Sequence, residues 1–186
     1  GSLNTFAKPT NVDTNSRILC YDIRDLGKQL LPVGMLVVLD SVFNRIIRNR
    51  KLGKSTWVYI DEIYLLFQHE YSANFLFTLW KRVRKYGACC TGLTQNVDDL
   101  LQSHTARTML ANSEFLVMLN QAATDRAELA NLLNISDNQL SYITNVDSGR
   151  GLIKCGSAIV PFMNSFPKNR LYQLMTTRPS ETMAAA

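Results

Sequence analysis

The sequence predicts an α/β protein with a largely parallel sheet, and three observations support this fold class. Short runs rich in β-branched and aromatic residues alternate with longer segments whose apolar residues recur at helical spacing. Two of the helical segments end at glycines, Gly53 and Gly87, which suit helix C-termini. The 186 residues are 46% hydrophobic and 19% charged, so the chain has enough apolar material for the core of one domain.

Up to residue 93 the pattern predicts an arm followed by three strands and two intervening helices. The arm is polar and interrupted by proline, and the first helix has Pro32 in its opening turn. Ser72 is expected to cap the second helix, which ends at Gly87. The arm covers residues 3–17, the strands cover 17–23, 56–60 and 88–93, and the first helix runs from 35 to 51.

Beyond residue 93 the pattern predicts short helices, one further strand and a hairpin. Thr124 is a plausible cap for one helix, and Ser136 with Gln139 forms a capping box that starts another. The hairpin turns at Gly156 and Ser157. The helices are expected at 98–103, 105–112, 125–133 and from 136, the strand at 114–119, the hairpin at 151–162, and a final strand or edge at 171–176.

Composition excludes several classes of protein. No run approaches 18 consecutive apolar residues and no signal-peptide layout opens the chain, so the sequence predicts neither a membrane span nor a leader. The four cysteines include no C-x-x-C pair and are expected to be buried thiols in a reducing compartment. The net charge of +5 permits a nucleic-acid or other anionic partner without demonstrating one.

The strongest functional signal is the hydrophobic strand that ends in Asp61 and Glu62. In a parallel α/β sheet, ligands bind at the carboxyl ends of strands. The first carboxylate can hold the water shell of a nucleotide-bound Mg²⁺, and the second can deprotonate the attacking water. This is the Walker B pattern of nucleotide hydrolases. The alternative is a solvated turn in which Asp61 caps the following helix.

Gln95, between Thr94 and Asn96, follows the next strand and is a candidate for contacting both the γ-phosphate and the attacking water. The alternative for this amide is ordinary turn chemistry. Gly53-Lys54-Ser55 resembles the end of a phosphate-binding loop, but a helix precedes it and a strand follows it. A true P-loop has the opposite order, so the sequence predicts no Walker A motif in this chain.

Basic residues gather near two helix ends, where they suit the helix dipole or a surface for DNA or a neighbouring subunit. The DNA or subunit contacts proposed from this pattern are Lys81, Arg82, Arg84 and Lys85, and a second cluster contains Arg45, Arg48, Arg50 and Lys51. Arg107, Arg126 and Arg150 are single arginines. Each is either an ordinary surface cation or an arginine finger that reaches a neighbour's nucleotide.

Several blocks in order resemble the VirB-type, TraG/TraE-like conjugation ATPases of type IV secretion, especially those of Gram-positive conjugative elements. The blocks are TNVDTNSRILCYDIRDLGKQL, WVYIDEIYLLF, LWKRVRKYGACCTGLTQNVDDLL, ARTMLANSEFLVMLNQAATDR and GRGLIKCGSAIVPF. This resemblance covers about residues 3–179. It implies a RecA-like P-loop NTPase fold, of which residues 18–178 are the C-terminal portion, without the Walker A strand and loop. Residues 1–17 then form the arm, and 179–186 a disordered tail whose Ala184–Ala186 resembles vector sequence.

The resemblance also implies roles for individual residues. Asp61 and Glu62 stand at the Walker B pair, Asp61 as the water-mediated Mg²⁺ ligand, and Gln95 stands at the sensor position. Arg107 stands in the following arginine motif, Arg126 in the Asp-Arg of the intervening helix, and Arg150 within a Gly-x-Gly-Leu block.

The implied whole protein is a hexameric, Mg²⁺- and ATP-dependent motor at the cytoplasmic face of the cell membrane. It would power DNA or protein transfer, or channel assembly. Its partners would be other secretion components and a coupling protein, with DNA as a candidate and the membrane contacted only indirectly. This piece alone is expected to be inactive. The alternatives are a non-catalytic RecA-like module that binds DNA or docks to a partner, and another hexameric DNA translocase of the same superfamily.

Overall fold

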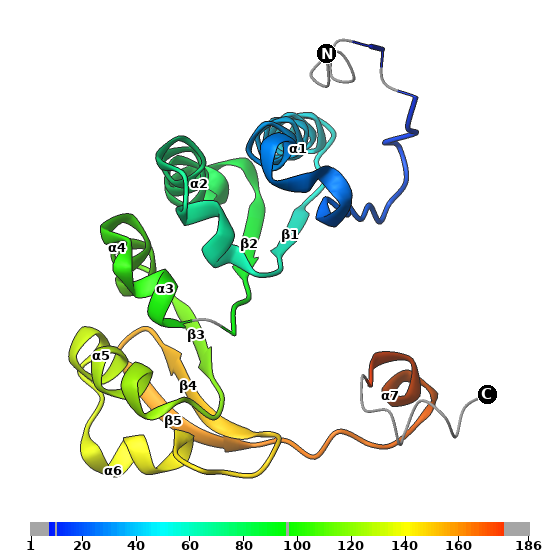
Figure 1. The fold of residues 1–186 in the computed structure, drawn as a ribbon. Helices are drawn as coiled ribbons and strands as arrows, with labels where there is room; N and C mark the ends of the chain where they lie inside the picture. Colours follow the sequence, from blue (N-terminus) through cyan, green and yellow to red (C-terminus); the bar gives the residue numbers. More distant parts are fainter. Residues whose placement is uncertain (1–7, 10, 96, 177–186) are drawn as a thin grey trace. The chain divides into compact units, whose positions relative to one another are not determined.

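The computed structural model describes residues 8–9, 11–95 and 97–176, and these divide into two compact units, one up to Met109 and one from Leu110 onward. Each unit contains its own small sheet (Figure 1). The α/β fold class predicted from the sequence is confirmed. The parallel pairing lies in the first unit, and the strands of the second unit are antiparallel to one another.

The first unit places helices beside one parallel strand pair (Figure 1). Strands β1 and β2 pair in register from Thr56 opposite Ala88 to Ile60 opposite Gly92. The elements are the 3-10 turn η2 (Arg24–Leu26), α1 (Gly27–Lys51), β1 (Thr56–Ile60), η3 (Ile63–Phe67), α2 (Glu70–Arg82), η4 (Val83–Tyr86), β2 (Ala88–Gly92), α3 (Val97–Gln102) and α4 (His104–Ala111).

The core of this unit joins α1 to α2 and η4. The Phe43 ring packs edge-on against Phe75 and Tyr86, with centroids 6.3 and 5.5 Å apart. Ile46, Leu76, Leu79 and Leu101 are among the most deeply buried side chains. Fully burying each such side chain stabilises the fold by about 1.5–3 kcal/mol.

The described residues cover only one face of the β1–β2 pair. Thr56, Val58 and Ile60 are half-buried, while Trp57 and Tyr59, which alternate with them, are 65% and 67% exposed. Because successive side chains of a strand point to opposite faces, the second face of this pair is open and apolar.

The second unit contains an antiparallel sheet of order β3–β4–β5. The hairpin predicted around Gly156 and Ser157 is confirmed, with Cys155 opposite Ala158. Ile143 and Leu152 are buried at its core. The elements are β3 (Phe115–Met118), α5 (Ala123–Leu133), α6 (Asp137–Leu140), the 3-10 turn η5 (Ser141–Ile143), β4 (Arg150–Cys155), β5 (Ala158–Met163) and α7 (Arg170–Met175).

The predicted strand at 17–23 is wrong, because the described chain forms no ladder there and Ile18 is 77% exposed. A strand needs a pairing partner, and β1 pairs only with β2 within the described residues. The predicted strand at 171–176 is also wrong. The segment forms α7, whose first turn is capped by Asn169 Oδ1 accepting the Tyr172 N–H at 3.1 Å.

Three predicted helix starts are corrected by the structure. Pro32 lies inside α1, because half-buried Leu30 and Leu31 extend the apolar face of the helix before it. Ser72 lies inside α2, where its hydroxyl donates to the carbonyls of Leu66 and His69 instead of capping. Helix α5 begins after Ala122 rather than Thr124. The capping box at Ser136 is confirmed, as are the glycine helix ends.

The prediction that the cysteines are buried is wrong for Cys20, Cys89 and Cys155, which are exposed. Cys89 follows the strand alternation onto the open face of β2. Cys90 points the other way and is half-buried, and burial, assisted by the neighbouring Cys89 charge, raises its pKa to about 12.

One helix meets the length and hydropathy expected of a membrane span, although the sequence has no run of 18 consecutive apolar residues. Residues Gln29–Lys51 of α1 are long and apolar enough to cross a membrane, with a mean hydropathy of 1.7 over an 18-residue window. Only 22% of that window is buried in the structure. Core helices of globular proteins can meet the same criteria, and Met35, Leu39 and Ile46 of α1 are buried.

Candidate functional site

The carboxyl ends of β1 and β2 carry the residues that the sequence singled out. Because the two strands are parallel and in register, Asp61 and Glu62 follow β1 at the same edge where Thr94 and Gln95 follow β2. The structure therefore brings the Walker B candidate and the sensor candidate to one edge of one sheet, which is where ligands bind in open α/β folds.

Glu62 has an unusual backbone, and one of its carboxylate oxygens has no hydrogen-bond partner within the described residues. Its φ and ψ are both 48°, in the left-handed region that a residue with a side chain seldom adopts. Its Oε2 atom is buried and has no hydrogen-bond partner within the described part of the chain. A buried carboxylate oxygen without a donor is costly, so such an atom is more typical of a reacting site than of a structural turn.

Asp61 is exposed, and its Oδ1 accepts the backbone N–H of Glu62 at 3.1 Å. No cap is formed on the following turn, since η3 has no side-chain cap hydrogen bond. The alternative in which Asp61 serves as a helix cap is therefore not supported. An exposed carboxylate beside an unpartnered one fits a water-coordinated Mg²⁺ and its attacking water, the arrangement expected for hydrolysis of a nucleotide.

The turn after β1 is held to the turn after β2 by backbone hydrogen bonds. Leu93 N–H donates to Ile60 O at 2.8 Å, and Ile63 N–H donates to Leu93 O at 2.9 Å. Leu93 thus binds the chain on both sides of the Asp61–Glu62 pair. The sequence does not single out Leu93, because its side chain carries no chemistry and the contact is made by its backbone.

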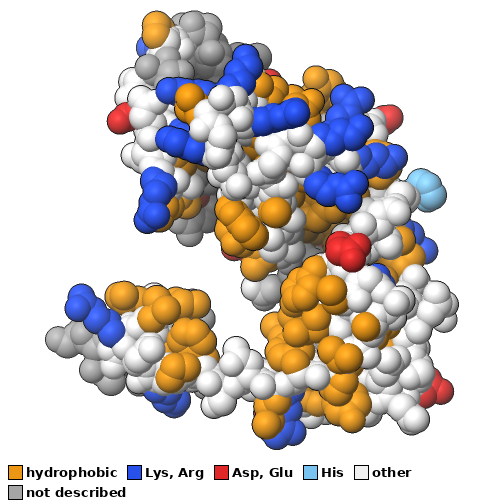
Figure 2. Space-filling model, turned by 180° about the vertical axis from the view of Figure 1, so that it is seen from behind, with side chains coloured by type: hydrophobic (Ala, Val, Ile, Leu, Met, Phe, Trp, Pro, Cys, Tyr) orange, Lys and Arg blue, Asp and Glu red, His pale blue; other side chains and the backbone are white. Residues whose placement is uncertain are grey.

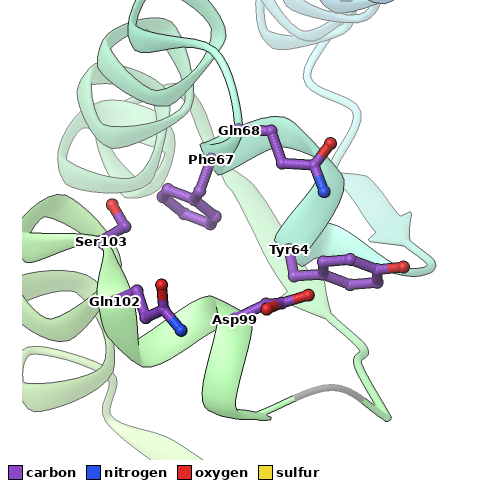
Figure 3. A pocket seen from close by; sticks show the side chains of 6 residues that line it. All are labelled: Tyr64, Phe67, Gln68, Asp99, Gln102 and Ser103. Atoms are coloured by element: carbon purple, nitrogen blue, oxygen red, sulfur yellow. The ribbon is translucent and has the colours of Figure 1, made fainter. Parts of the chain in front are cut away.

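A pocket of about 360 Å³ lies between η3 and α3 (Figure 3). It was not expected from the sequence, because its two walls come from the separate segments 64–68 and 99–103. Its lining contains no lysine or arginine, so it does not fit a triphosphate. The lining residues are Tyr64, Phe67, Gln68, Asp99, Gln102 and Ser103.

The segment Gly53-Lys54-Ser55 closes a helix, as the sequence predicted. Gly53 has a φ of 68°, and the N–H groups of Gly53 and Lys54 donate to the carbonyls of Arg50 and Asn49 at 3.0 and 2.9 Å. A helix C-terminus carries partial negative charge, so this segment is unsuited to phosphate.

The three candidate finger arginines lie in different units. In the first unit, the Nε–H of Arg107 donates to the carbonyl of Leu101 at the end of α3. In the second unit, Arg150 is exposed and forms an ion pair with Asp147 at 3.7 Å. Arg126, also in the second unit, is half-buried in the first turn of α5.

The two glycines around Arg150 have structural roles. A Cβ added to Gly151 would lie 2.2 Å from Met118 O, and Gly149 has a φ of 86°. Both positions therefore require glycine for backbone packing, which explains the Gly-x-Gly pattern without a ligand.

The two basic clusters lie in the same unit and are joined through aromatic contacts. The Arg50 guanidinium lies over the Tyr86 ring at 5.4 Å, and Tyr86 contacts Phe43 of α1. Lys81 Nζ lies 3.9 Å from the Phe77 ring centroid. Figure 2 shows Lys and Arg side chains gathered over this unit. The Arg45 guanidinium already has partners within the chain, because it donates hydrogen bonds to the carbonyls of Thr14 and Ser16.

Comparisons with known proteins identify the family and the fold of this chain. The family model described as the TraG P-loop domain matches residues 9–153, a range that includes every candidate site residue. The solved structure of VirB4 from Thermoanaerobacter pseudethanolicus is similar, with a TM-score of 0.76 and 26% identity, over 87% of this chain and 45% of that one. The chain thus spans less than half the length of that relative. No curated protein matches the sequence.

Proposed function

Because the chain belongs to the TraG P-loop domain family, we propose that it is the C-terminal, Walker B and sensor part of a type IV secretion ATPase. The whole motor would couple ATP hydrolysis to transfer of DNA or protein, or to assembly of the channel. The observation that carries this proposal is the strained Glu62, whose unpartnered carboxylate oxygen lies at the carboxyl edge of β1 and β2.

The chemistry assigned to these residues is water attack on the γ-phosphate. Asp61 orients the water shell of the bound cation, and Glu62 accepts the proton of the attacking water as its oxygen bonds to phosphorus and ADP leaves. Gln95 positions that water and a γ-phosphate oxygen. Mg-ATP, when bound, supplies the electrophilic phosphorus and a cation that offsets the developing negative charge.

The phosphate-binding loop would come from the rest of the parent polypeptide. Two observations support this division of the site. The only G-K-S/T sequence in the chain closes a helix instead of opening one. The β1–β2 pair also has an open face with Trp57 and Tyr59 exposed, as expected for a sheet that other parts of a domain cover.

Substitution of Glu62 in the parent polypeptide tests the proposed function. Glu62→Gln should abolish turnover while ATP binding survives, because the amide keeps the shape but accepts no proton, and loss of a general base costs about 10²–10⁴-fold. Glu70→Gln, at an exposed carboxylate in the first turn of α2, is the matched control and should turn over normally. Near wild-type turnover by Glu62→Gln would remove Glu62 from this role. Asp61→Asn should instead weaken the dependence on Mg²⁺.

The assembled parent would be a hexameric ring at the cytoplasmic face of the cell membrane, in contact with other secretion components and a coupling protein. In such a ring an arginine of one subunit completes the site of its neighbour. Arg107 is the first choice, because it stands in the arginine motif that follows the sensor segment in the sequence, and Arg150 and Arg126 follow.

A second candidate function is binding of DNA by the basic surface. The support is that Lys81, Arg82, Arg84 and Lys85 have no carboxylate partner within the described residues, and that Arg50 and Lys51 end the helix packed beside them. Exposed cations without a carboxylate partner attract a polyphosphate chain without reading its sequence.

The salt dependence of DNA binding by the chain tests this surface. Four phosphate contacts give a log–log slope of about −3 to −4. Changing Lys81 and Arg84 to glutamate should weaken binding and flatten the slope, whereas Arg170→Glu on exposed α7 should do neither. Sequence-selective or salt-independent binding would contradict this role. If no binding occurs even at low salt, the cluster is instead a contact between subunits.

The remaining alternatives are a non-catalytic RecA-like docking module and another hexameric DNA translocase of the same superfamily. A docking module requires no general base, so normal partner binding with no ATP turnover in the parent would favour it. The translocase would show turnover stimulated by DNA in the absence of secretion partners.

A further inference from the structure

The segment that carries Asp61 and Glu62 is held in place by two backbone hydrogen bonds of Leu93, which we call the Leu93 clamp. Neither carboxylate takes part in these bonds. The β1–β2 ladder ends with Ile60 opposite Gly92. The next residue of the second strand, Leu93, then donates to Ile60 O and accepts from Ile63 N–H. Asp61 and Glu62 therefore form a two-residue turn, and the residues on either side of it are both hydrogen-bonded to the backbone of Leu93.

This closure explains why Glu62 adopts a left-handed backbone. Both neighbours, Ile60 and Ile63, must reach the backbone of Leu93, so the two intervening residues have to reverse direction within a short span. Glu62 φ 48° and ψ 48° accomplish that reversal, and its own carbonyl accepts Leu65 N–H at 3.0 Å to begin η3. The strain is sustained only while the surrounding contacts hold.

The side chain of Ile63 makes one of these contacts, and glycine at position 92 permits it. A Cβ added to Gly92 would lie 2.5 Å from Ile63 Cδ1 and 3.3 Å from Ile63 Cγ2. Ile63 is only 5% exposed, so its terminal methyl is surrounded by protein and moves aside only if its neighbours repack. The Ile63 side chain therefore lies directly against the backbone of the second strand.

We propose that Gly92 and Ile63 are positioning residues that, together with the Leu93 backbone, fix the left-handed turn and so set the place of the Glu62 carboxylate. This inference rests on the proposed function of Glu62 as the general base. The Leu93 backbone also connects the segment that carries Glu62 to the segment that carries Gln95, because Leu93 lies two residues before Gln95. A displacement of the segment that carries the sensor amide is transmitted to Glu62 through two backbone hydrogen bonds.

The kinetic test uses the parent polypeptide. Gly92→Ala should lower kcat about 10- to 100-fold, as expected for a misplaced general base, with KM for ATP changed less than about threefold. Ile63→Val removes the Cδ1 methyl that the new Cβ meets. Added to Gly92→Ala it should restore most of kcat, while Ile63→Val alone should stay near wild type.

Gly87→Ala is the matched control. Gly87 lies just before β2, has a φ of 66°, and an added Cβ would meet nothing within 4 Å. The substitution should lower stability through backbone strain without changing kcat. Unchanged kcat in Gly92→Ala, or a loss that Ile63→Val does not reverse, would overturn the proposal.

Amide hydrogen exchange in the 186-residue chain separates this proposal from the role of Glu62. Gly92→Ala should speed exchange at the Ile63 and Leu93 amides about tenfold or more, and the double variant should slow it again. Unchanged exchange at both amides overturns the clamp whatever the activity of the parent. If exchange responds but Glu62→Gln of the parent remains active, the clamp stands and the catalytic assignment fails.

Discussion

Replacing Gly151 with alanine should destabilise the second unit far more than a single added methyl group would suggest. Gly151 is buried in β4, and the new Cβ would lie 2.2 Å from the backbone oxygen of Met118 and 2.8 Å from Phe162 Cε1. The first of these is a backbone atom of β3, which pairs with β4, so the two strands must separate or slip. Overpacking of this kind costs about 1–3 kcal/mol, and a clash with backbone places the cost near 3.

Urea unfolding of the 186-residue chain, followed by circular dichroism, measures this cost. Gly156→Ala in the hairpin turn is the control, because its φ is 56° but the added Cβ would meet only Glu114 Oε1 at an ordinary 3.5 Å. Its expected cost is about 1 kcal/mol, from the left-handed backbone alone. If Gly151→Ala were as stable as Gly156→Ala, the reasoning that the Gly-x-Gly block is required by strand packing would be refuted.

Four further predictions concern the nucleotide, the ring and the thiols. Calorimetry should detect no micromolar binding of Mg-ATP by the 186-residue chain, because two carboxylates without a phosphate loop repel a polyphosphate; micromolar binding would contradict the divided site. Inactive Arg107→Ala and inactive Glu62→Gln parent proteins, shown to form mixed rings, should recover part of the ATPase activity, and no recovery would transfer the finger role to Arg150. Iodoacetamide should modify exposed Cys89 well before Cys90. Because the pKa of Cys90 is raised from 9.0 to about 12, the stability contributed by its protonated thiol should be complete below pH 9 and lost as the pH rises toward 12. Alkaline unfolding curves of wild type and Cys90→Ala would measure this loss.

The elements that sequence predicted well are those whose signals are local. The run from Thr56 to Ile60 is apolar, β-branched and bounded by turn residues, and it forms β1 as expected. The capping box at Ser136 and the glycine ends of helices are likewise set by neighbouring residues. Local sequence signals also predicted that Asp61 and Glu62 lie at the end of a strand.

The elements that sequence predicted poorly depend on partners elsewhere in the chain. The segment 17–23 has strand composition but no ladder to join, and 171–176 is helical because Asn169 caps it. The left-handed Glu62 and its clamp could not be foreseen, since they arise from backbone bonds to Leu93 and from the absence of a side chain at Gly92. Strand alternation alone, applied to 88–92, would have placed Cys89 and Cys90 on opposite faces.

The most direct test of Glu62 as the general base is a rapid-quench single turnover of the parent with Mg-ATP bound in advance. This measurement isolates bond cleavage from product release, so it reports the step assigned to Glu62. Glu62→Gln is expected to retain bound ATP and to form ADP at least about a hundredfold more slowly than wild type, while Glu70→Gln matches wild type. Formation of ADP by Glu62→Gln at the wild-type rate would contradict the assignment of this carboxylate as the general base.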